Sequence, residues 1–215
     1  MLLLLAGLAS AAVRRAAIVV DGLWSAAEVN AMEQQLMYAP YTWGEGDFAG
    51  ANPAGSVHEL NLTAPMVSQI VERVGELSAV FAAEGERWSD ETVDPDDFEL
   101  YRAYVNRFMR GDHPLPHTDA DFADHVTLLY YANRVWKRRM GGETVFFDAA
   151  GEIGQSVLPR PGRIALFSGA VQHSARPPLS DVYWPRLTLA LKWRRRDVGA
   201  AAAAAAAGAA TAREL

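Results

Sequence analysis

Two histidines and one aspartate are the residues of this chain whose types and spacing are best suited to chemistry. His117 and Asp119 lie two positions apart. In an extended segment, side chains two positions apart point to the same face, so this imidazole and this carboxylate can meet at one point. A third ligand has to come from elsewhere, and we expect His173, which follows the apolar, strand-like run 163–167. The three residues therefore predict a metal site.

The ligand types restrict the metal and its chemistry. Two imidazoles and one carboxylate on one face of an octahedron leave the opposite face open, as in non-heme Fe(II) oxygenase sites. The chain contains no cysteine, which excludes disulfides and thiolate-bound zinc or iron–sulfur clusters. Two further histidines, His113 and His125, have no carboxylate two positions away in a strand pattern. We interpret them as loop or surface residues.

Five motifs follow one another between Tyr101 and Trp193. In chain order they are the pair 117–119, the run 126–131, the segment 141–147, the run 158–167 with the histidine at 173, and the run 186–193. This order resembles the iron(II) and 2-oxoglutarate-dependent dioxygenases, specifically their prolyl 4-hydroxylase-like branch. The resemblance covers roughly residues 98–194, and several ordered motifs are more specific than any single one.

The resemblance implies a fold, a reaction and a set of cofactors. The fold is an α+β domain with a double-stranded β-helix core, a cupin-like jelly roll, and with N-terminal helices packed on one sheet. The reaction is hydroxylation of a substrate coupled to decarboxylation of 2-oxoglutarate to succinate. The cofactors are Fe(II), 2-oxoglutarate as co-substrate, O2 and ascorbate, and the residues that bind the metal and carry catalysis are His117, Asp119 and His173.

A cation has to hold the distal carboxylate of 2-oxoglutarate, and Arg186 is the predicted anchor. Arginine suits this role because its planar guanidinium meets a carboxylate through two parallel hydrogen bonds. On an extended strand Arg186 and Thr188 share one face, so Thr188 can add a hydroxyl, and the pair resembles the Arg-x-Ser of the family. Lys192 offers a second cation on this face. Arg176 is a weaker alternative because the two prolines after it predict a loop.

Three further residues are assigned to the co-substrate pocket by the resemblance. Tyr131 matches a family position that hydrogen-bonds the co-substrate, and strand alternation points it inward while Tyr130 points outward. Thr144 matches a position that lines the same pocket. Phe108 stands where the family generally has a tyrosine, so either Tyr104, on the same strand face, supplies the hydroxyl or that contact is missing.

Two helices are predicted before these motifs. Residues 17–20 are predicted as a short strand, after which Ser25 and Glu28 form a capping box that begins a helix ending near Met37. Thr63 is predicted to cap the second helix, in which apolar residues recur at helical spacing. That apolar face is expected to belong to the core.

Strands are predicted from Phe98 onward, where short runs of Val, Leu, Tyr and Phe alternate with Gly, Pro and Asp. This pattern indicates an antiparallel β architecture. Residues 38–60 are interpreted as a loop that Trp43 anchors to the core. We expect substrate choice to depend on the loops 38–60, 132–142 and 177–185.

Length and composition predict one domain between two appendages. The 215 residues, half of them hydrophobic, can bury one sizeable core. Residues 1–16 are predicted to be a secretory signal peptide, because the apolar run 1–13 closes on an Ala-x-Ala pattern; a buried first strand or an incorrect start residue is the alternative. Residues 17–196 form the predicted Fe(II)/2-oxoglutarate dioxygenase domain, with its β-helix from about 98, and 197–215 form an alanine-rich tail.

Charge and targeting signals restrict partners and location. The formal net charge of -6 gives no overall basic field to attract nucleic acid, and no apolar run is long enough for a stable membrane span. The apolar start and the glycosylation sequon at Asn61 favour the secretory pathway, with the endoplasmic reticulum lumen as the expected compartment and the cytoplasm as the alternative.

Several functions are compatible with these observations. The leading hypothesis is a hydroxylase that acts on a prolyl or other residue of a peptide or protein. A small-molecule hydroxylase or a demethylase of the same superfamily is the alternative within the class, and the negative charge counts against the demethylase. A non-catalytic jelly-roll binding module is the alternative from another class. The presence of the whole set of motifs counts against it.

Overall fold

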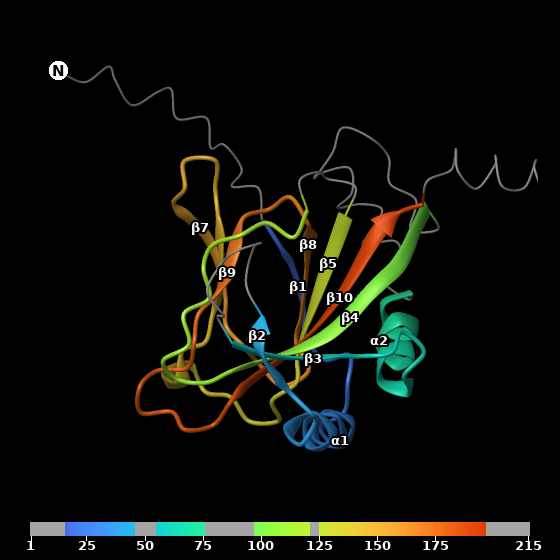
Figure 1. Ribbon diagram of the computed structural model, residues 1–215, viewed down its shortest axis with the longest axis horizontal. Coiled ribbons are helices and arrows are strands. Elements are labelled where there is room, and N and C mark those ends of the chain that lie inside the picture. Colours follow the sequence, from blue (N-terminus) through green and yellow to red (C-terminus); the bar gives the residue numbers. More distant parts are fainter. Residues whose placement is uncertain (1–15, 46–54, 76–96, 121–124, 197–215) are drawn as a thin grey trace, which may run out of the picture.

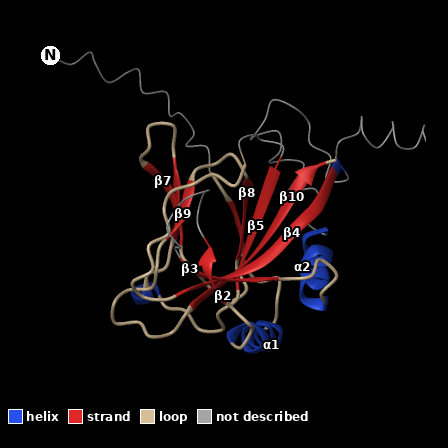
Figure 2. Ribbon diagram, viewed as in Figure 1, coloured by secondary structure: helices blue, strands red, loops and turns tan. Residues whose placement is uncertain are grey.

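The computed structural model describes residues 16–45, 55–75, 97–120 and 125–196, and strands dominate these ranges (Figures 1 and 2). Seven strands form one antiparallel sheet in the order β1-β8-β5-β10-β4-β3-β2. Three strands form a second antiparallel sheet in the order β7-β6-β9. The antiparallel architecture predicted from Phe98 onward is therefore confirmed.

The elements have the following bounds. The large sheet contains β1 (Ile18–Val20), β2 (Thr42–Glu45), β3 (Gly55–Glu59), β4 (Phe98–Phe108), β5 (His125–Tyr131), β8 (Ile164–Ser168) and β10 (Arg186–Arg195). The small sheet contains β6 (Thr144–Phe147), β7 (Ile153–Val157) and β9 (His173–Ala175), and the helices are α1 (Ala26–Met37), α2 (Pro65–Gly75) and the short 3-10 helix η2 (Arg138–Met140).

The starts of the two helices were predicted with different success. The capping box of α1 is confirmed, because the Ser25 hydroxyl accepts from the Glu28 amide at 3.3 Å and the Glu28 carboxylate accepts from the Ser25 amide at 2.7 Å. The predicted Thr63 cap is wrong, because its hydroxyl donates to Asn61 instead. Helix α2 begins with Pro65, whose fixed φ suits the first helical position.

Buried side chains of both helices share one hydrophobic cluster with one face of the large sheet. The helices contribute Val29, Met32, Leu36, Met66, Val67, Ile70 and Val74, and the sheet contributes Val105, Leu128, Tyr130, Ile164, Leu187, Leu189 and Leu191, among others. In Figure 1, α1 and α2 lie beside the sheet on the side away from β7 and β9. This face is filled with core, which leaves the other face for the site.

The other face of the large sheet packs toward the small sheet. Tyr131 and Leu129 belong to this second cluster, whereas Tyr130 belongs to the first, so the predicted alternation along β5 is confirmed. Phe146 of β6 packs edge-on against Phe167 of β8 with ring centroids 4.9 Å apart. The two sheets thus enclose an apolar layer, and the polar residues considered below lie next to it.

The interpretation of 38–60 as a loop is wrong for part of this range, because β2 and β3 extend the large sheet. Gly55 pairs at the start of β3, where a Cβ would lie 2.5 Å from the Phe108 ring. Glycine is therefore required here by a close approach between strands, and not by a turn. The predicted anchoring role of Trp43 is also wrong, since this residue on edge strand β2 is 63% exposed.

Several predicted segments lie outside the described residues. They include residues 1–15 of the predicted signal peptide, the continuation of the second helix beyond Gly75 and the alanine-rich tail at 197–215. Within the ranges that the structure describes, no helix is both long and apolar enough to cross a membrane.

Candidate active site

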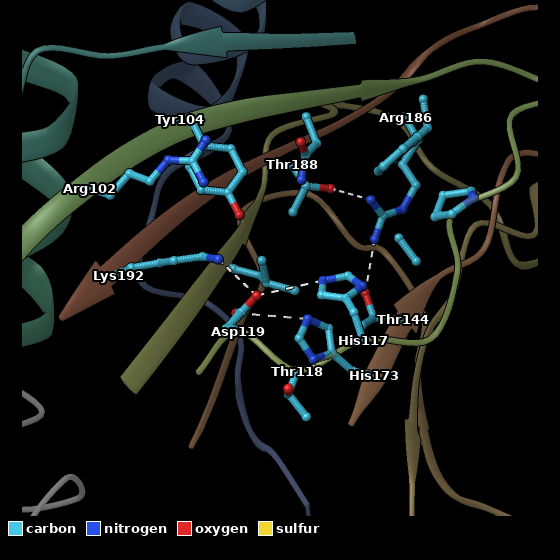
Figure 3. Close-up of a pocket in the computed structure, with 15 residues that line it drawn as sticks. Arg102, Tyr104, His117, Thr118, Asp119, Thr144, His173, Arg186, Thr188 and Lys192 are labelled. Atoms are coloured by element: carbon cyan, nitrogen blue, oxygen red, sulfur yellow. Dashed lines mark hydrogen bonds and ion pairs between the residues drawn. The ribbon is translucent and has the colours of Figure 1, made fainter. Parts of the chain in front are cut away.

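His117, Asp119 and His173 converge, with ligand atoms that all lie within 4.8 Å of one another (Figure 3). Asp119 lies between the two imidazoles: its Oδ1 is 3.6 Å from Nε2 of His117, and its Oδ2 is 3.8 Å from Nε2 of His173. Two backbone hydrogen bonds of 2.9 Å join His117 and His173 in an isolated bridge. His173 is the first residue of β9. The structure thus brings together the three residues that the sequence singled out.

Backbone carbonyls fix the orientation of both imidazoles. Nδ1 of His117 lies 2.9 Å from the Leu115 carbonyl oxygen, and Nδ1 of His173 lies 2.9 Å from that of Val171. Because a carbonyl only accepts, each Nδ1 must carry the hydrogen. Each Nε2 then keeps its lone pair and faces Asp119, which is the arrangement of metal-ligating histidines.

The protonation states of the cluster also suit a metal. Burial opposes ionisation of Asp119, but the neighbouring His117, His173 and Lys192 outweigh it and hold the Asp119 pKa well below its usual range. Thr127 donates a further hydrogen bond to this carboxylate. Burial lowers the pKa of His173. An anionic carboxylate and neutral imidazoles are the forms that bind metals, so the donor set fits a divalent cation with nitrogen and oxygen ligands.

The cluster borders a cavity of about 230 Å³ between the two sheets. Its wall includes all three residues of the cluster and five of the other residues discussed above, namely Tyr104, Phe108, Thr144, Arg186 and Thr188. Lys192 and Arg102 line it as well. A small polar ligand can therefore contact the cluster and Arg186 in one cavity.

Arg186 is a buried cation whose hydrogen-bond partners are all uncharged. It is 1% exposed, and its guanidinium donates to the Gly142 carbonyl at 2.7 Å, to the Thr188 hydroxyl at 2.6 Å and to the Thr144 hydroxyl at 2.9 Å. Burial lowers its pKa, and among the described residues no carboxylate lies within ion-pair distance of it, the Glu143 charge acting from farther away. A buried charge without a counter-ion is costly, so this site is suited to bind an anion.

Tyr131 packs against Arg186 and Thr144 on the side away from the cavity. It does not line the cavity; its hydroxyl shares a 2.7 Å hydrogen bond with the Thr144 hydroxyl, and its ring centroid lies 5.4 Å from the guanidinium carbon of Arg186. The structure therefore places Tyr131 against two residues of the pocket, and Thr144 stands between its hydroxyl and the cavity.

Tyr104 lines the cavity at a different place. In the register of β4 and β10, Phe108 pairs with Arg186 and Tyr104 pairs with Ala190, farther along the strand. Figure 3 shows Tyr104 beside Arg102 and Lys192. Burial raises the pKa of Tyr104 to about 12, so its hydroxyl stays protonated.

The structure separates the two alternative cations. Arg176 is exposed and does not line the cavity, as its lower ranking predicted. Lys192 does line it, but Lys192 Nζ donates to Asp119 Oδ1 at 2.8 Å. The sequence analysis did not predict this ion pair, the hydrogen bond from Thr127 to Asp119 or the position of Arg102 in the cavity wall. The only signal available was the shared strand face of Lys192 and Arg186.

Residues 103–194 match the family model described as the 2OG-Fe(II) oxygenase superfamily. This stretch is therefore similar to that superfamily. The match supports a dioxygenase that uses Fe(II), 2-oxoglutarate and O2, and the matched range contains all three residues of the cluster together with Arg186. The comparison with curated proteins found no match.

Several solved structures share the fold of this chain. A Pseudomonas putida prolyl-4-hydroxylase matches with a TM-score of 0.62 at 19% identity, over 84% of this chain and 93% of that one. HygX from Streptomyces hygroscopicus, solved with nickel and 2-oxoglutarate bound, matches with a TM-score of 0.63 at 14% identity, over 86% of this chain and 84% of that one. A Trichoplax adhaerens prolyl hydroxylase in complex with a hypoxia inducible factor peptide fragment matches with 0.56 at 16%, over 84% of each chain. The predicted jelly-roll fold is confirmed.

Proposed function

We propose that this chain is an Fe(II)- and 2-oxoglutarate-dependent dioxygenase that hydroxylates its substrate while 2-oxoglutarate is decarboxylated to succinate. One observation carries the proposal: the cluster of two imidazoles and a carboxylate shares a cavity with a buried guanidinium that has no counter-ion among the described residues. The superfamily match of residues 103–194 supports the same reaction.

Each residue of the pocket has a proposed role. His117, Asp119 and His173 would hold Fe(II), which when bound supplies the activation of O2 and the oxidation of 2-oxoglutarate. Arg186 would pair with the distal carboxylate of 2-oxoglutarate, and the Thr188 hydroxyl would help to orient it. The apolar layer between the sheets would keep bulk water from the part of the cavity next to Arg186.

The proposed substrate is a prolyl or other amino-acid residue, with a small-molecule substrate as the second candidate. The Trichoplax adhaerens enzyme was solved with a peptide, which supports the first class. HygX was also solved with hygromycin B, which supports the second. We further propose 17–196 as the catalytic domain, because β1 pairs with β8 and thereby completes the edge of the large sheet.

Succinate formation tests this proposal. Purified full-length protein with Fe(II), 2-oxoglutarate and O2 is expected to release succinate, and members of a panel of proline-rich peptides and free amino acids are expected to increase the rate. Omission of Fe(II) or chelation of the metal should abolish the reaction. Folded, iron-loaded protein that forms no succinate with any member of the panel would instead support a non-catalytic binding module.

A further inference from the structure

Lys192 is a second buried cation that lines the cavity, and the proposed function assigns no role to it. It is 8% exposed and contacts Asp119 at 2.8 Å. Its Nζ forms an ion pair with the Asp119 carboxylate, which favours the charged form of the lysine. The side chain is therefore an ammonium group at the metal-binding cluster.

Lys192 and Arg186 mark opposite ends of the cavity. They lie on the same face of β10, six positions apart, so their backbone positions are separated by about 20 Å along an extended strand. Figure 3 shows His117 and Asp119 between them. A 2-oxoglutarate molecule that pairs with Arg186 reaches the cluster from the Arg186 side, whereas Lys192 contacts Asp119 from the opposite side. The Lys192 end is left for another ligand.

The charges around the cluster indicate the chemistry of that ligand. Without a metal, Asp119 and Lys192 offset each other. With Fe(II) and dianionic 2-oxoglutarate bound, the positive charges of the metal, Lys192 and Arg186 exceed by one the negative charges of Asp119 and 2-oxoglutarate, counting the groups in the cavity and its wall. Arg102 adds none to this excess, because it is paired with Glu59. A buried excess of one positive charge favours a ligand with one negative charge.

We propose that Lys192 binds a carboxylate of the substrate, so that the substrate is a free amino acid or the C-terminal residue of a peptide. This inference rests on the proposed function, because it concerns the substrate of the same site. The Tyr104 hydroxyl, protonated and beside Lys192, supplies a second donor for the carboxylate. Since Lys192 touches Asp119, a substrate bound there lies next to the metal-binding cluster and away from the Arg186 end.

Calorimetric binding to the full-length protein tests the inference without turnover. Ni(II) replaces Fe(II), 2-oxoglutarate is saturating, and the probes are the common amino acids with their amides and Gly-Pro with its amide. At least one acid is expected to bind at least about tenfold more tightly than its amide, and Lys192→Met should remove this preference. Lys137→Met is the matched control, because Lys137 is exposed and outside the cavity wall. The Gly-Pro pair distinguishes a C-terminal residue from a free amino acid.

Three results separate the possible failures. If Lys192→Met weakens binding of an acid and its amide equally, Lys192 only positions Asp119 and the inference is overturned. If no acid in the panel binds while Ni(II) and 2-oxoglutarate do, the inference is also overturned, and the proposed function stands. If the wild-type protein binds neither Ni(II) nor 2-oxoglutarate, the proposed function itself fails.

Discussion

His173→Ala is expected to lower the affinity for Fe(II) by more than about 100-fold and to abolish succinate formation. Loss of a residue that merely orients a metal ligand already costs roughly 10- to 100-fold, and this substitution removes one of three protein ligands. The remaining pair, His117 and Asp119, supplies only two of the three ligand atoms, while the backbone hydrogen bonds between positions 117 and 173 are kept. Titration with Fe(II) without O2 measures the change.

His113→Ala is the control for this substitution. His113 is exposed and lies outside the cluster, so its variant should bind Fe(II) like the wild-type protein. Circular dichroism of all variants checks that the fold is retained. Wild-type Fe(II) affinity in folded His173→Ala protein would exclude this residue as a ligand.

Arg186→Met is expected to weaken binding of 2-oxoglutarate while Fe(II) affinity stays within about threefold of wild type. Removing one partner of a buried, hydrogen-bonded charge pair costs about 2–5 kcal/mol, which corresponds to roughly 30-fold to several thousand-fold in Kd. Methionine has a similar apolar stem, so the packing against Phe108 and Tyr131 is largely kept. Equilibrium dialysis of 2-oxoglutarate against the Ni(II)-loaded variant measures the effect.

Arg176→Met is the matched control, because Arg176 is exposed and does not line the cavity. Its variant should bind 2-oxoglutarate normally. The opposite pattern, with normal binding by Arg186→Met and weak binding by Lys192→Met, would show that the two cations have exchanged the roles assigned to them here.

The convergence of the cluster could be predicted from the sequence because two simple regularities apply to it. The spacing of two positions predicts that His117 and Asp119 share one side, and the order of motifs indicates that the strand run before His173 belongs to the same jelly roll. The same regularity gave the shared face of Arg186 and Thr188. These five side chains line one cavity.

The partner of Lys192 could not be predicted in the same way. Strand periodicity shows which face a residue lies on, but not which residue of a distant segment faces it, and Asp119 and Lys192 are 73 positions apart. The sequence alone left Lys192 as a competitor of Arg186 for one carboxylate. The structure places it against a residue of the metal-binding cluster.

Strands β2 and β3 were missed for a related reason. Their order comes from pairing with the edge of β4 and not from their own composition, which includes glycines that usually indicate turns. Gly55 shows the ambiguity, because the same residue type serves a turn in one place and a close packing contact with Phe108 in another. Local composition does not distinguish the two uses.

The central claim is that His117, Asp119 and His173 bind Fe(II) in the cavity where Arg186 binds 2-oxoglutarate, and visible absorption spectroscopy tests it most directly. Anaerobic addition of 2-oxoglutarate to the Fe(II)-loaded protein is predicted to produce the weak visible charge-transfer band of the iron chelate, and His117→Ala should not produce it. A folded, Fe(II)-loaded wild-type protein that shows no band with saturating 2-oxoglutarate would contradict the account.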